Sequence, residues 1–136
     1  MSLDRLRRAL TEHSAETSVA SPDRRLAGRT YAIPFDDVWT AALSLAAERP
    51  RWTVMRADDQ RGVIEAEART RVFGFVDDLT VRIGLDGNAQ TRLDMTSTSR
   101  RAKGDLGTNA RRIARFLQLL DRRLMAGPDQ IITRVR

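Results

Sequence analysis

The chain has 136 residues and a formal net charge of +6, with 41% hydrophobic and 31% charged residues, which is the composition of one soluble globular domain. Cysteine is absent, which excludes thiolate nucleophiles, thiolate metal sites and disulfides. The single histidine, His13, lies in a polar N-terminal stretch, and neither glycine-rich nucleotide-binding motif occurs, so we predict no metal and no cofactor.

The N-terminal residues 1–24 are predicted to form a short helix followed by a flexible linker. Leu3, Leu6 and Leu10 recur at helical spacing, and the stretch after them is rich in Ser, Thr and Ala. This region has no apolar core typical of a signal peptide, and no later run is long enough to span a membrane. We therefore expect a cytoplasmic protein with a single folded domain over residues 25–136.

The domain is predicted to begin with a strand over residues 28–33 and a helix after Pro34. Asp36 and Asp37 lie where negative charge stabilises a helix N-terminus, and Pro50 ends the helical pattern. The apolar residues of this helix recur at i, i+3, i+4 and i+7, namely Phe35, Val38, Trp39, Ala42, Leu45 and Ala46.

From residue 51 the apolar residues alternate with a period of two, which predicts antiparallel strands. Trp52 and Val54 share one strand face, a turn follows at residues 58–62, and small apolar residues alternate with charged ones over residues 64–72. Two further alternating runs, residues 79–85 and 89–99, predict a hairpin.

The loop of this hairpin must hold an odd number of residues, because directly opposed residues share a face of the sheet. A loop over residues 86–88 would place Arg82 opposite Arg92, whereas a loop over residues 86–90 would place Arg82 opposite Asp94. A cross-strand pair of opposite charge is favoured by about 0.2–1 kcal/mol. We therefore predict the longer loop, although turn chemistry can override so small an energy.

Residues 105–126 carry one apolar stripe and are predicted to form a long helix that ends at Gly127 and Pro128. Ile131 and Ile132 suggest a short final strand or a packed tail. The whole pattern predicts an α+β fold, in which an antiparallel sheet of about five strands is packed on one face by two helices, in the order (α)-β-α-β-β-β-β-α.

Two segments, Thr70–Asp78 (TRVFGFVDD) and Ser97–Ile113 (STSRRAKGDLGTNARRI), stand out from the rest of the sequence. Together they resemble the domain of unknown function 1499 family over about residues 31–120. The signature turn of that resemblance consists of Phe73, Phe75, Asp77 and Asp78. The resemblance implies no particular activity, because none is established for the family.

The second of these segments joins a strand to the N-terminus of the long helix, where free N–H groups and the helix dipole can hold an anion. The residues predicted to contact that anion or another partner are Ser99, Arg100, Asp105, Asn109, Arg111 and Arg112. The alternative is structural: Asp105 caps the helix, and the arginines pair with Asp77 and Asp78.

Two other functions stay open. A hydrolase-like enzyme would use paired carboxylates such as Asp77 and Asp78, although we assign no catalytic residue. A nucleic-acid-binding protein would use the basic C-terminal region, and residues 71–76 are similar to the RNP1 motif of RNA-recognition domains. Val72 and Asp78 depart from that motif, and the aromatic side chains look like core residues.

We therefore predict a non-enzymatic binding or scaffold module. Its partner is expected to be another protein or a small anionic ligand, and self-association through the N-terminal helix is a further alternative.

Overall fold

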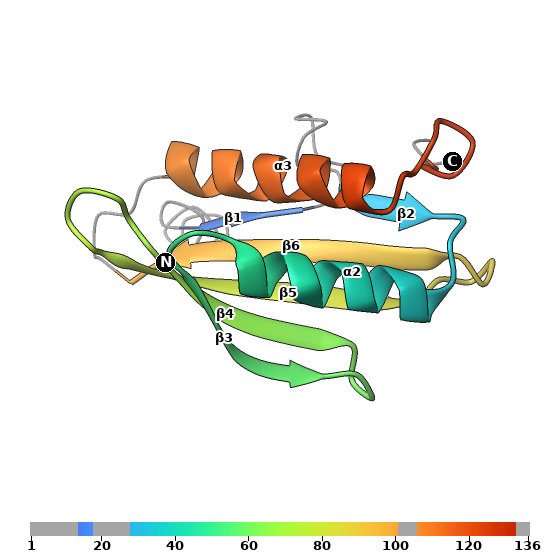
Figure 1. Cartoon of the computed structure of the whole chain (residues 1–136), viewed down its shortest axis with the longest axis horizontal. Helices are drawn as coiled ribbons and strands as arrows, with labels where there is room; N and C mark the ends of the chain where they lie inside the picture. The colour runs from blue at the N-terminus through green and yellow to red at the C-terminus, as the bar shows by residue number, and fades with distance from the viewer. Residues whose placement is uncertain (1–13, 18–27, 101–105, 133–136) are drawn as a thin grey trace, which may run out of the picture.

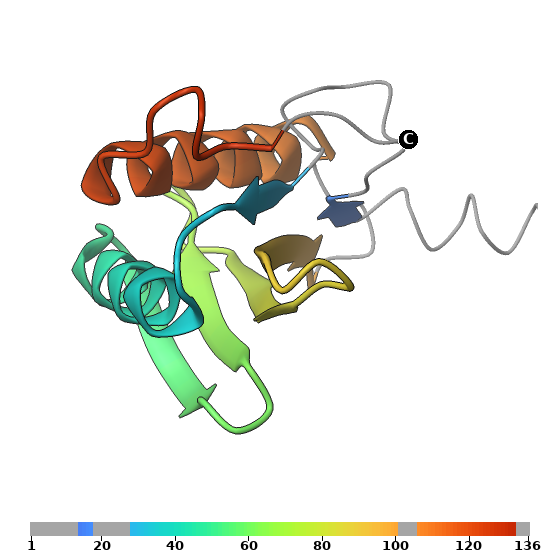
Figure 2. The same ribbon diagram turned by 90° about the vertical axis from the view of Figure 1, so that its right-hand side faces the viewer.

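The α+β fold is confirmed by the computed structural model, which describes residues 14–17, 28–100 and 106–132. A six-stranded antiparallel sheet in the order β1-β6-β5-β4-β3, with β2 also pairing β6, is covered on one face by two helices (Figures 1 and 2). The elements are β1 (Ser14–Glu16), β2 (Arg29–Tyr31), α2 (Phe35–Glu48), β3 (Trp52–Asp58), β4 (Val63–Arg69), β5 (Val76–Leu85), β6 (Thr91–Ser99) and α3 (Leu106–Arg123).

One edge of the sheet is formed by β1 and β2, which pair with different parts of β6. Strand β1 therefore lies within the segment predicted to be a linker. Thr17 fixes its end, because its Oγ1 donates to Asp94 Oδ1 at 2.7 Å and accepts the backbone N–H of Met95 at 2.9 Å. The predicted N-terminal helix lies outside the described residues.

The two helices form where the sequence predicts them. Asp36 and Asp37 lie in the first turn of α2, and that helix ends directly before Arg49. The predicted cap of α3, Asp105, lies outside the described residues. The core between helices and sheet consists mainly of Val38, Ala42, Leu45, Ile64, Val81, Ile83, Leu93, Met95, Ile113, Phe116, Leu117 and Leu120.

The hairpin of β5 and β6 has the predicted five-residue loop, with Arg82 opposite Asp94 and Ile83 opposite Leu93. The interactions that fix this register differ from the predicted cross-strand charge pair. Asp86 Oδ1 accepts the backbone N–H groups of residues 88 and 90, while Asp94 is bound by Arg92 and Thr17. Turn chemistry therefore accounts for the register that cross-strand charge was expected to favour.

Three predicted strands are shorter or less regular than their patterns suggest. Strand β2 covers only Arg29–Tyr31 of the strand predicted over residues 28–33. Strand β4 ends at Arg69, so residues 70–72 belong to a loop, and β3 has an irregularity between Val54 and Arg56. At the C-terminal end, Ile131 forms a single bridge with Tyr31, and residues 133–136 lie outside the described part of the chain.

The inner face of the sheet, which the helices cover, changes character along its length. Near the loop of the β5–β6 hairpin it carries large apolar side chains. At the opposite end the buried residues other than Leu79 are small or polar: Ala66, Ala68, Asp77, Ser97 and Ser99. Because the residues of both signature segments meet here, we call this region the signature end, and it is on the left of Figure 1.

Candidate functional site

A buried polar cluster joins α3 to the inner face of the sheet at the signature end. Asp77 and Ser99 are directly opposed on β5 and β6, so both side chains point inward, and Ser97 lies two residues further along β6. Ser97 Oγ donates to Asn109 Oδ1 at 2.5 Å, and Asn109 Nδ2 donates to Ser99 Oγ at 2.9 Å. We call Asp77, Ser97, Ser99, Asn109 and Arg112 the buried polar cluster.

Arg112 supplies the positive charge of this cluster. Its Nη1 lies 2.7 Å from Asp77 Oδ2, 3.0 Å from Asn109 Oδ1 and 3.1 Å from Ser97 Oγ. The side chains of Arg112 and Asp77 are only 12% and 3% exposed, and Asp77 Oδ1 is buried with no hydrogen-bond partner. Removing one partner of such a buried ion pair strongly destabilises a folded protein. The buried polar cluster therefore stabilises the packing of α3 on the sheet.

Arg100 lies on the other face of the sheet. It donates to Asp78 Oδ1 at 2.7 Å and to Glu67 Oε2 at 2.5 Å. These hydrogen bonds, first with Asp78 and then with Glu67, raise the pKa of Arg100 above its usual range. The structural alternative, in which arginines pair with Asp77 and Asp78, is thus confirmed for those contacts.

The predicted anion-binding residues are only partly brought together. Ser99, Asn109 and Arg112 meet in the buried polar cluster, whereas Arg100 is on the opposite face with its guanidinium against two carboxylates. Arg111 is exposed and donates to Thr108 Oγ1 at 3.2 Å. Asp105 lies outside the described residues.

The carboxylates that the alternative of a hydrolase-like enzyme would use do not converge. Asp77 and Asp78 are neighbours on β5, so their side chains point to opposite faces, and each is held by a different arginine. Asp94, another carboxylate that such an enzyme could use, is bound by Thr17 and Arg92. Two carboxylates on opposite faces of a strand cannot share a proton or divide acid and base roles at one substrate atom.

The loop over residues 70–75 joins β4 to β5 and projects beyond the ends of the strands (Figure 1). Thr70 holds it closed, because its backbone N–H donates to Phe75 O at 2.8 Å and its Oγ1 accepts the Phe75 N–H at 2.9 Å. Gly74 has a φ of +66°, a conformation that a residue with a Cβ rarely adopts. The loop is therefore a defined turn.

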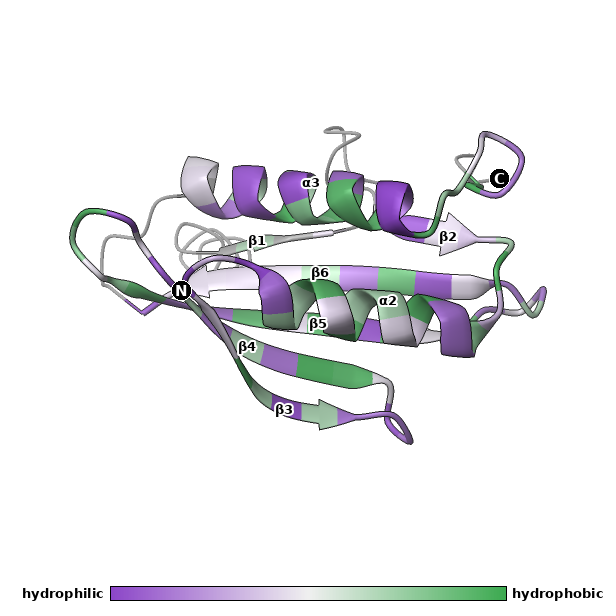
Figure 3. Ribbon diagram, viewed as in Figure 1, coloured by the Kyte–Doolittle hydropathy of each residue, from purple (hydrophilic) through white to green (hydrophobic). Residues whose placement is uncertain are grey.

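Two large apolar side chains lie at the tip of this loop, where Val72 is 81% and Phe73 is 74% exposed. Figure 3 shows the hydrophobic tip next to a hydrophilic stretch on the side that leads from β4. The Phe73 ring stacks on Phe75 with 5.3 Å between centroids. The expectation that these aromatic residues belong to the core is wrong for Phe73, because β4 ends before the loop and the Phe73 side chain is left exposed at its tip.

Several arginines surround the base of the loop. Arg51 lies beside Arg69, whose backbone N–H donates to Arg51 O at 2.9 Å, and Arg71 is exposed within the loop itself. Arg49 lies two residues before Arg51, with its guanidinium 6.0 Å from the Trp52 ring centroid. Arg115, on α3, is close enough to Arg49 for its charge to act on that guanidinium. We call Arg49, Arg51, Arg69, Arg71 and Arg115 the basic collar.

The positive charge of the basic collar is not neutralised within the described part of the chain, where no collar arginine forms an ion pair with a carboxylate. Burial, followed by the like charges of Arg115 and Arg51, lowers the pKa of Arg49, and its Nε is buried with no hydrogen-bond partner. Arg51 has a φ of +64°, which is uncommon for a residue with a side chain. The collar is thus a region of unbalanced positive charge next to an apolar tip.

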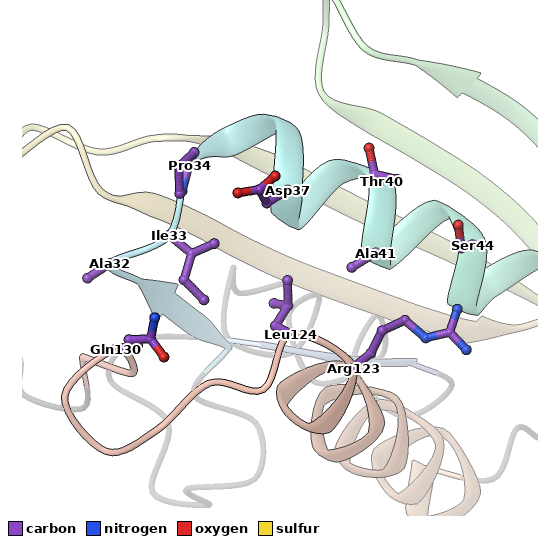
Figure 4. A pocket seen from close by; sticks show the side chains of 10 residues that line it. All are labelled: Ala32, Ile33, Pro34, Asp37, Thr40, Ala41, Ser44, Arg123, Leu124 and Gln130. Atoms are coloured by element: carbon purple, nitrogen blue, oxygen red, sulfur yellow. The ribbon is translucent and has the colours of Figure 1, made fainter.

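A groove of about 610 Å³ lies elsewhere, between the first turns of α2 and the end of α3 (Figure 4). Asp37 and Arg123 are its charged lining residues, and Arg123 is already bonded to Glu48. The groove is open and brings no set of polar groups to one point. We therefore place the candidate site at the loop and the collar.

Two further features bear on partner type. In residues 14–17, 28–100 and 106–132, no group of three or more His, Cys, Asp or Glu side chains could hold a metal ion. Neither helix in those ranges is long and apolar enough to cross a membrane.

Residues 7–120 match the family described as protein of unknown function DUF1499. The chain belongs to the DUF1499 family. The match begins well before residue 31, where the resemblance was expected to start, and it covers both segments that meet at the signature end. No curated protein matches the chain.

Proposed function

We propose that this DUF1499 protein is a non-enzymatic binding module that recognises an acidic partner through loop 70–75 and the basic collar. The observation that carries the proposal is the exposure of Val72 and Phe73 at the tip of a well-defined loop, beside arginines that form no ion pair with a carboxylate of the described residues. Adjacent exposed apolar side chains mark interaction surfaces. Unneutralised positive charge attracts and orients an acidic partner.

The arrangement of the acidic residues supports binding over catalysis. Asp77 is buried against Arg112, and Asp78 is held by Arg100 on the other face. Both carboxylates therefore contribute to the structure of the sheet and of α3. The same contacts support the structural interpretation of the segment that leads into α3, because an anion there would compete with Asp77, Asp78 and Glu67 for the two arginines.

Nucleic acid is the second candidate partner, favoured by the stacked rings of Phe73 and Phe75 beside Arg71. Aromatic rings and arginine side chains are the groups on which unpaired bases stack. The rings lie in a loop instead of on the strand surface that the similarity to RNP1 predicted.

The proposal is tested by salt-gradient elution from an immobilised polyanion such as heparin. The variant Arg51→Gln/Arg71→Gln/Arg115→Gln removes three exposed collar charges. We expect it to elute at a clearly lower salt concentration than the wild type, because counterion release makes such binding depend on the number of charge contacts.

The matched control is Arg61→Gln/Arg82→Gln/Arg122→Gln, which removes the same charge from exposed positions away from the collar. We expect the control to elute close to the wild type. Equal elution of the two triple variants would mean that net charge alone determines binding, and would overturn the proposal.

A further inference from the structure

We infer that the acidic partner is the surface of an anionic lipid bilayer, into which loop 70–75 inserts Val72 and Phe73 while the basic collar contacts lipid phosphates. This inference rests on the proposed function and names the partner. It is carried by the shape of the loop, the chemistry of its tip and the position of the arginines.

The loop is already in a conformation suited to insertion. Its ends are joined by the two hydrogen bonds between Thr70 and Phe75, and a third bond joins the Gly74 N–H to Thr70 O at 3.1 Å. Insertion would therefore order little additional backbone. The apolar surface of Val72 and Phe73, which water now contacts, would be transferred to the boundary between headgroups and acyl chains.

The loop projects beyond the strand ends (Figure 1) and the most exposed side chain of its tip is aliphatic, which favours a bilayer over a nucleic acid. Val72 has no ring on which a base could stack, and Phe75 is only partly exposed, so Phe73 alone offers an open aromatic face. Proteins that bind single strands generally use a positively charged groove with several stacking residues along it. A projecting apolar tip is instead suited to a fluid lipid bilayer, whose lipids can pack around the inserted side chains.

The collar places positive charge where lipid headgroups would lie. Arg69 and Arg71 come shortly before the tip in the chain, and Arg51 lies beside Arg69 at the base of the loop. Arginine side chains can lie along apolar surface while their guanidinium groups stay at the polar boundary. Each arginine near an anionic surface is expected to strengthen partitioning by about fivefold.

The test is co-sedimentation of the full chain with vesicles of phosphatidylcholine alone or mixed with phosphatidylglycerol. We expect the wild type to sediment with the anionic vesicles and only weakly with the neutral ones. The variant Val72→Asp/Phe73→Asp should lose at least tenfold in partitioning, because it removes the inserted side chains and adds negative charge.

The matched control is Leu85→Asp/Met125→Asp, since these apolar side chains are 64% and 86% exposed outside the loop. All four substituted residues are exposed, so both variants should melt like the wild type, which circular dichroism checks. We expect the control to lose no more than about threefold in partitioning through its added negative charge. An equal loss in the two variants would overturn the inference.

Other probes separate this inference from the proposed function. Wild-type protein that requires its collar arginines to bind heparin but ignores anionic vesicles would overturn the membrane inference and leave the proposed function in place. Retention on single-stranded RNA that is lost in Val72→Asp/Phe73→Asp, without binding to vesicles, would assign the site to nucleic acid. It would also overturn the membrane inference. Failure to bind vesicles, heparin and RNA would overturn both.

Discussion

Replacing Arg112 with methionine should destabilise the fold more than any other exchange of a single charge in α3. The substitution leaves Asp77 buried without its ion-pair partner, with one carboxylate oxygen already unbonded, and it also removes the donor to Ser97 and Asn109. Breaking a buried pair in this way costs about 3–5 kcal/mol. A domain of this size unfolds with roughly 5–15 kcal/mol, so the loss is a large share of the total.

Urea unfolding followed by tryptophan fluorescence measures this loss, because Trp52 stacks on Phe116 in the core with 5.4 Å between centroids. The midpoint urea concentration should fall accordingly, and a thermal melt of the same variant should show a Tm lower by about 10–20 °C. Replacing both charges, as Arg112→Met/Asp77→Leu, should restore part of the stability, because no unpaired charge is then left in the interior.

The control is Arg111→Met, which removes the neighbouring arginine on the exposed side of α3 and should change stability by no more than about 0.5 kcal/mol. If Arg112→Met were as well tolerated as Arg111→Met, the buried polar cluster would not fasten α3 to the sheet.

Three further predictions concern other parts of the molecule. Burial, followed by the hydrogen bond to Asp121, raises the pKa of Tyr31 above its ordinary value of 10.0, so stability should be complete below pH 10 and fall by about 1.4 kcal/mol per unit above it. Denaturation as a function of pH should show this fall in the wild type and not in Tyr31→Phe, and a flat wild-type profile would contradict it. Gly62→Ala should cost about 1–3 kcal/mol in urea unfolding, because its Cβ would lie 2.0 Å from Ile83 O, whereas Gly84→Ala has free space and should be nearly neutral. Inorganic phosphate at constant ionic strength should leave the Tm unchanged, because Arg100 and Arg112 already hold carboxylates, and a rise that Arg100→Ala abolishes would instead support the anion site.

The fold was largely predictable because each helix and most strands carry a pattern of apolar residues within their own sequence. Alternation with a period of two identifies the faces of β4, β5 and β6, and parity alone restricts the hairpin loop to an odd length. Strand β1 could not be predicted in the same way, because Ser14–Glu16 has no alternating apolar pattern and is paired only because β6 presents a free edge to it. Its position depends on its partner and not on its own sequence.

The contacts at the signature end were predictable in part, and the exposed loop was not. The pairing of arginines with Asp77 and Asp78 follows from their proximity at the end of a hairpin and the start of a helix. The exposure of Phe73 does not follow from its residue type, because an apolar run reads equally well as a buried strand. The signals that could have shown the turn are Gly74 within that run and Thr70 before it, whose hydroxyl closes the loop.

The most direct measurement of where a partner binds is a titration of isotope-labelled protein with a short heparin oligosaccharide, followed by amide chemical shifts. The account predicts shifts concentrated in residues 49–51, in residues 69–75 and around Arg115. Shifts that instead cluster along the groove between Asp37 and Arg123, or that are spread evenly over the basic surface, would contradict recognition by the loop and its collar.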